Sequence, residues 1–191
     1  GKITPTITVS GAAAFGQYTW DSRPIVNITR DNDSEPIGTN ETVYVKDYRV
    51  DGTPQTAISL GIEYRAPKFW WIELNGTYFD DMYLSFNPAR RTSAAVEGLD
   101  LNSELVKEIL GQEKLPSGYI LNLTGGKSWK IDKYFVSLYA NVANVLDNTE
   151  LITGGYEQLR FDYENKDVNK YPSNYFYMYG RTYMLILTLS F

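Results

Sequence analysis

Long stretches of this chain alternate between apolar and polar side chains, which is the period of a β-strand with two different faces. The last nine residues show the pattern most clearly, because one face carries Tyr183, Leu185, Leu187, Leu189 and Phe191. Strands of globular proteins usually have about five or six residues, whereas a tilted strand that crosses a membrane needs about nine to eleven. The pattern therefore predicts an all-β fold built from unusually long strands.

Six such segments are predicted as strands: 6–17, 56–65, 69–79, 119–129, 134–145 and 176–191. Aromatic side chains lie near both ends of the apolar face, as Trp70 and Tyr78 do on one segment and Tyr119 and Trp129 on another. An apolar face towards lipid, with aromatic residues at both interfaces, is typical of a membrane β-barrel. A soluble β-sandwich also alternates, and it remains the alternative, although it does not normally require strands of this length.

The connections between these segments alternate in length. Tight turns at 65–68 and 130–133 alternate with three long excursions, at about 21–54, 85–118 and 146–175. The alternation is regular if 42–50 forms a strand-like extension within the first excursion. Membrane barrels have short periplasmic turns and long extracellular loops. The second excursion contains the stretch 103–111, which either Asn102 or Ser103 can cap and which is predicted to be a packed loop helix.

Composition removes several classes of function. The 191 residues include no Cys and no His, so thiolate metal sites and the commonest neutral-pH general base are absent, and we expect no enzyme and no cofactor. The net charge is -5 and the 18 basic residues are scattered, which argues against a nucleic-acid partner.

Several short stretches of the sequence resemble those of a known family. Residues 141–148, N-V-A-N-V-L-D-N, are similar to the N-x-x-N-L-F-D stretch near the penultimate strand of TonB-dependent outer-membrane receptors, with Val145 and Leu146 as mild departures. Three further stretches resemble receptors of the starch-utilisation type from Bacteroidetes: 78–91, 155–162 and 175–181. The final strand resembles the C-terminal strand of outer-membrane barrels, which serves in that family as the assembly signal.

The resemblance implies that residues 1–191 are the C-terminal part of the β-barrel domain of a receptor: an antiparallel transmembrane segment of about six strands from a larger, plugged barrel. Residues 1–5 do not begin a signal peptide, so we expect a piece of a longer protein. The implied location is the bacterial outer membrane, with several passes through it.

The implied function is import of a nutrient, a glycan or a peptide, into the periplasm with energy supplied by TonB. The implied partners are outer-membrane lipid, the plug and other barrel strands, TonB through an N-terminal part that is not in this sequence, and a surface substrate-binding lipoprotein. The alternative is a self-contained β-rich binding module, or a small barrel that acts as an adhesin or a porin.

Two groups of side chains are candidate loop or ligand contacts. Asp80, Asp81, Arg90 and Arg91 are predicted to form an ion-paired loop anchor, with contact to substrate as the minor alternative. Tyr156, Phe161 and Tyr163 belong to an aromatic cluster in the last excursion that either packs the loops together or binds a ligand. The acidic stretch 31–35 is expected to be a solvated loop rather than a calcium site, since it lacks the glycine and the distal glutamate of an EF-hand.

Overall fold

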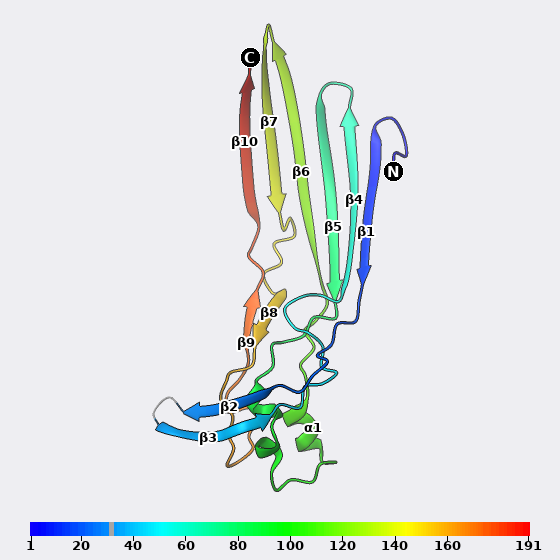
Figure 1. The fold of residues 1–191 in the computed structure, drawn as a ribbon. Coiled ribbons are helices and arrows are strands. Elements are labelled where there is room, and N and C mark those ends of the chain that lie inside the picture. The colour runs from blue at the N-terminus through cyan, green and yellow to red at the C-terminus, as the bar shows by residue number, and fades with distance from the viewer. Residues whose placement is uncertain (31–32) are drawn as a thin grey trace.

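A computed structural model describes residues 1–30 and 33–191. Its centre is one antiparallel sheet (Figure 1). The strands, in spatial order, are β1 (Ile7–Phe15), β4 (Thr56–Ala66), β5 (Trp70–Asp80), β6 (Gly118–Ile131), β7 (Tyr134–Ala143) and β10 (Thr182–Ser190). Each strand lies beside the next strand of the sheet along the chain, as in an up-and-down barrel. Within the described residues β1 and β10 each have one neighbour, so the sheet is open.

The register separates the two faces as the alternation predicted. Ile62, Leu74 and Leu123 are partners across β4, β5 and β6 and therefore share one face. The opposite face carries polar side chains that bond across strands: Asn75 Nδ2 donates to Ser59 Oγ at 3.3 Å, and Asn141 Nδ2 donates to Thr124 Oγ1 at 2.9 Å. The prediction of long strands with one apolar and one polar face is confirmed.

The last predicted strand, 176–191, is in fact two strands. β9 (Asn174–Tyr177) pairs with β8 (Ile152–Tyr156), and only β10 belongs to the large sheet. Between them the backbone is satisfied by side chains, because Asn144 Nδ2 donates to the Tyr179 carbonyl at 3.0 Å and Asp147 Oδ1 accepts from the Arg181 amide at 2.7 Å. These bonds replace the ladder that a continuous strand would need.

The expected extension at 42–50 is also wrong. The extended segment precedes it as β3 (Asp33–Thr42), which pairs with β2 (Ile25–Arg30). Residues 43–50 are irregular. Val43 and Val45 are fully buried there, and the segment makes only an isolated bridge, between Thr19 and Arg49, instead of a continuous strand.

Three long loops, 16–55, 81–117 and 144–181, gather at one end of the sheet, and the tight turns lie at the other (Figure 1). The second loop contains two 3₁₀ turns, η1 (Pro88–Arg91) and η2 (Ser93–Val96), and the predicted helix α1 (Glu104–Leu110). The Ser103 hydroxyl accepts from the Val106 amide at 3.3 Å, which confirms the predicted cap. No helix among the described residues is both long enough and apolar enough to span a membrane.

The core lies in the loops. Among the described residues, the buried hydrophobic side chains are Val43, Val45, Met82, Leu84, Ala95, Val106, Ile109, Leu115 and Leu151. None of them belongs to the six-stranded sheet, which exposes most of its large apolar side chains. The sheet is therefore a single layer with no core of its own, unlike the paired layers of a soluble β-sandwich.

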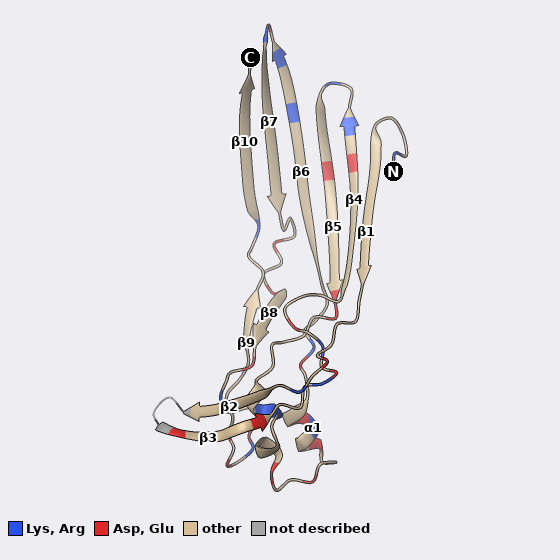
Figure 2. Ribbon diagram, in the orientation of Figure 1, with Lys and Arg blue, Asp and Glu red and all other residues tan. Residues whose placement is uncertain are grey.

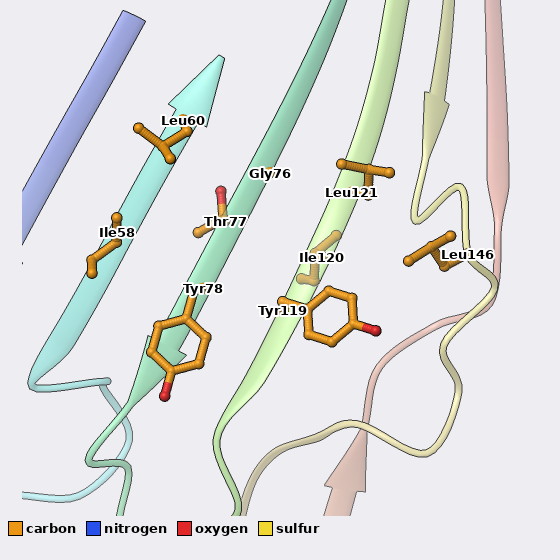
Figure 3. Close-up of a pocket in the computed structure, with 9 residues that line it drawn as sticks. All are labelled: Ile58, Leu60, Gly76, Thr77, Tyr78, Tyr119, Ile120, Leu121 and Leu146. Atoms are coloured by element: carbon orange, nitrogen blue, oxygen red, sulfur yellow. The ribbon is translucent and has the colours of Figure 1, made fainter. Parts of the chain in front are cut away.

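The apolar face has a shallow hollow of about 280 Å³ where β5 carries Gly76 between Leu60 and Leu121 (Figure 3). The close-up shows Leu146 beside it, from the loop that follows β7. A Cβ at position 76 would meet only Leu121, at 3.6 Å, so the hollow exists because glycine has no side chain.

Candidate functional site in the loop platform

The second and third long loops, 81–117 and 144–181, are here called the loop platform. A buried ion pair joins them: both Nη atoms of Arg91 donate to the carboxylate of Glu157, and the Nη2–Oε1 distance is 2.7 Å. The Arg91 side chain is 0% exposed and that of Glu157 is 6% exposed. Arg91 Nη2 also donates to the Gly111 carbonyl. Burial on this scale means that neither charge can be left without the other.

Asn87 adds hydrogen bonds between the same two loops. It precedes Pro88 at the start of η1, and its side-chain oxygen accepts from the Ala89 amide at 2.9 Å. Its Nδ2 donates to the carbonyls of Gln158 at 2.8 Å and Arg160 at 3.2 Å, and its backbone amide donates to Glu157 Oε2 at 2.7 Å. Sequence reasoning missed both Asn87 and Glu157, although Asn before Pro is a known signal for the start of a helical turn.

The four predicted anchor residues are ion-paired, but not with one another. Asp80 and Asp81 pair with Lys114 Nζ at 3.1 and 2.7 Å. Arg90 and Arg91 instead share Glu157, and Arg90 Nη1 lies 3.6 Å from Glu157 Oε1. The expected pairing between the two sets is wrong because each set has a closer partner from another part of the loops. The hydrogen bond from Lys114 lowers the pKa of Asp81, and the two aspartates raise the pKa of Lys114.

The three predicted aromatic residues fall in two places. Phe161 and Tyr163 are in edge-to-face contact, with ring centroids 5.2 Å apart, and the Tyr163 hydroxyl donates to the Ala89 carbonyl at 3.2 Å. Burial raises the pKa of Tyr163. Tyr156 lies on β8 instead, beside Phe176 at 5.8 Å, and is exposed. Tyr163 is thus a packing residue of the platform, whereas the ring of Tyr156 is accessible.

A polar cleft of about 380 Å³ opens between the two loops of the platform. It is lined by side chains that include Arg90, Glu108, Glu113, Asn169 and Tyr175. The Tyr175 hydroxyl donates to Glu113 Oε1 at 2.6 Å, and this bond raises the pKa of Tyr175. Among the described residues Arg90 Nε is buried without a hydrogen-bond partner. The cleft offers both donors and acceptors, which is the chemistry of a site for a polar solute.

Two further predictions concern the chain end and the acidic stretch. Tyr183, Leu185, Leu187, Leu189 and Phe191 all have exposed side chains. Their role as an assembly signal stays a prediction. In the stretch 31–35, Asp31 and Asn32 lie outside the described residues, whereas residues 33–35 begin β3, so the predicted loop is wrong for that part. The expectation that the stretch is not a calcium site stays a prediction.

Comparison with known proteins gives one informative likeness. No family model and no curated protein matches the sequence. The solved structures include the siderophore receptor PiuA from Acinetobacter baumannii, which superimposes with a TM-score of 0.53 at 15% identity. The superposition covers 99% of this chain and 20% of that one, so this chain spans about a fifth of the receptor's length. At this identity the likeness concerns the fold, which is similar to that of part of this receptor. The similar protein is a receptor rather than an enzyme.

Proposed function

We propose that residues 1–191 form the C-terminal barrel segment of an outer-membrane receptor that imports a nutrient with energy from TonB. One observation carries the proposal: a single-layer sheet with an exposed apolar face and two unpartnered edges superimposes over nearly its whole length on part of a receptor. A hydrocarbon environment accommodates such a face, and strands contributed by the rest of a barrel satisfy such edges.

The number of strands supports a larger barrel rather than a small complete one. The smallest bacterial single-chain barrels have about eight strands. Residues 1–4 cover only the start of β1, so within the part of the chain that the structure describes, the rest of β1 and the outer edge of β10 have no neighbouring strand, and lipid cannot satisfy their backbone groups. We therefore assign both edges to pairing with strands from elsewhere in the same receptor, as the partial coverage of the similar structure suggests.

The finer part of the proposal concerns subtype and substrate. The sequence stretches 78–91 and 155–162 favour a receptor of the starch-utilisation type. In that type the nutrient is a glycan or a peptide, and the partner above the loops is a surface lipoprotein. Both stretches contribute residues to the loop platform, and Arg90 and Glu157 from them line the polar cleft. Together with the accessible ring of Tyr156, the cleft is the proposed place of first contact with the nutrient.

Labelling from outside the cell tests the topology. The chain has no cysteine, so Leu159→Cys in the third loop and Lys133→Cys in the β6–β7 turn can each be introduced singly, in a parent receptor from which any other cysteine has been removed. A maleimide that cannot cross the membrane should label position 159 in intact cells and position 133 only after the outer membrane is permeabilised. Equal labelling of both positions in intact cells would overturn the assignment.

Uptake measurements test the function itself. Cells with and without the parent receptor are offered labelled oligosaccharides and labelled peptides, before and after the proton-motive force is dissipated. We expect uptake of one class to require both the receptor and the proton-motive force. Receptor-dependent uptake that persists without energy would instead identify a passive porin.

A further inference from the structure

Within the sheet and its tight turns, the basic residues lie towards the end where the turns are (Figure 2). Outside the three long loops the chain has six basic residues, which all belong to this end: Lys2, Arg65, Lys68, Lys127, Lys130 and Lys133. Within the two turn regions 65–69 and 130–134 the one acidic residue is Asp132. The opposite end is acidic, since 81–117 and 144–181 both hold more carboxylates than basic groups.

Three of these lysines can reach a lipid surface. Lys127 is on the apolar face, two residues from Trp129 and in register with Leu138 of β7. Its Nζ lies 5.9 Å from the centre of the Trp129 ring and donates to the Lys68 carbonyl, so the side chain extends towards the turn. Lys68 lies in the β4–β5 turn, where it is exposed, and Lys133 lies in the β6–β7 turn. Lys68, Lys127 and Lys133 are here called the basic strip.

The other two basic residues of these turn regions belong to the polar face. Arg65 forms a salt bridge with Glu63 at 2.7 Å and lies over the ring of Trp71. Lys130 lies over Phe135, 5.8 Å from the ring centre. Neither is on the face that carries Trp129, so neither is part of the strip.

Aromatic side chains place the basic strip at the depth of lipid headgroups. Trp70, Trp129 and Tyr134 surround it on the apolar face and are exposed. On β6, Trp129 and Tyr119 are ten residues apart on that face, which is about 33 Å along the strand and about 25 Å across the membrane after the usual tilt. This matches the apolar band of a barrel, so the two ends of the face lie at the two membrane interfaces.

We propose that the basic strip binds the anionic headgroups of phospholipids in the leaflet on the turn side. The inference rests on the proposed membrane function. The kind of lipid follows from charge complementarity, because three ammonium groups beside one carboxylate attract a headgroup with a net negative charge more strongly than a zwitterionic headgroup. Lys133 Nζ, 5.4 Å from the centre of the Tyr134 ring, holds its charge at the interfacial aromatic residues. At the loop end, Lys114 in the second long loop is already paired with Asp80 and Asp81.

A local fluorescence measurement tests the proposal on the full parent receptor. Ile131→Cys, an exposed position on the apolar face beside the strip, carries a fluorophore in a receptor reconstituted into bilayers of phosphatidylcholine and phosphatidylglycerol. Either lipid is supplied with brominated acyl chains, and the ratio of the two quenching curves gives the local preference for phosphatidylglycerol. One lysine near an anionic surface contributes about a fivefold preference for anionic lipid, so we expect at least a severalfold local preference for phosphatidylglycerol at low salt. This preference should decline at high salt, because salt screens the charges.

The variant K68Q/K127Q/K133Q should abolish that preference, so that the two lipids quench the fluorophore to about the same extent. The control K46Q/K107Q/R160Q removes the same number of positive charges from exposed loop positions and should keep the preference. Equal quenching by the two lipids in the parent, or a preference that survives in the strip variant, overturns the lipid inference but leaves the membrane assignment intact. Absence of quenching by both lipids instead contradicts the membrane assignment on which the inference rests.

Discussion

In the loop platform Leu84 and Leu115 are almost completely buried, whereas in the sheet Leu60, Leu185 and Leu187 leave 63%, 73% and 72% of their surface exposed. The same residue type is therefore buried in one part of the chain and exposed in another. The platform holds a small hydrophobic core of the kind that the hydrophobic effect produces in water. The sheet has no such core, and its apolar face is stable only where another solvent or another protein covers it.

The largest expected effect comes from breaking the buried ion pair of the platform. Arg91→Ala removes both short hydrogen bonds to the buried Glu157 carboxylate and leaves Arg90, at 3.6 Å, as its remaining ion-pair partner, which should cost up to about 3–5 kcal/mol of local stability. Hydrogen exchange on the parent receptor should rise in β8, β9 and α1 but not in β4, β5 or β6. The exposed Arg160→Ala serves as the control and should change neither region. An equal rise in the sheet would mean that platform and sheet unfold together.

A charge on the apolar face should test the sheet. Leu187→Arg places a charge near the middle of β10 on the apolar face, at a cost of about 2–4 kcal/mol at the bilayer midplane. Thr188→Arg adds the same charge one residue later on the opposite face and should cost much less. Denaturant unfolding of the parent receptor in lipid bilayers measures both. Similar losses for the two variants would contradict the lipid-facing assignment.

Deleting Phe191 should change assembly more than stability. Its burial in lipid is worth about 2 kcal/mol, too little to unfold a large barrel. We expect few receptors per cell to reach the surface, while those that assemble keep nearly normal stability. Phe191→Tyr should restore surface levels and Phe191→Asp should not, as surface labelling can measure. Normal levels for both the deletion and the Asp variant would remove the proposed assembly signal.

The smallest effect is a dependence of the platform on pH. A hydrogen bond from Lys170 is the main cause that lowers the pKa of Asp162 to about 2, below its unfolded value of 3.8. Because the folded pKa is the lower one, this contribution is complete above pH 4 and is lost as the pH falls towards 2. Hydrogen exchange at 162–170 should therefore stay protected at pH 5 and weaken below pH 4. Lys170→Gln should move this weakening to higher pH, and the sheet should not respond.

Sequence reasoning worked where the cause is local. Alternation is a property of neighbouring residues, so the two faces of β4, β5, β6 and β7 could be predicted to within a few residues at each end. The Ser103 cap is equally local, and it was predicted as well.

Sequence reasoning failed where the structure depends on contacts between residues that are far apart in the sequence. Arg91 and Glu157 are separated by 66 positions, and nothing near Arg91 shows that Glu157 is a better partner than Asp80. The break between β9 and β10 depends in the same way on the side chain of Asn144, which lies 35 residues before Tyr179. Patterns of single residues predict which side chains face the same way, but not which loops meet.

The buried contacts of Arg90 and Arg91 with Glu157 also limit how the loop platform can diversify. A chimera that receives the second loop from a relative lacking both arginines, but keeps its own third loop, would enclose an unneutralised carboxylate. The two loops can therefore be exchanged as a unit far more easily than one at a time. Directed evolution of a new uptake specificity should transplant 81–117 and 144–181 together and can leave the strands between them unchanged.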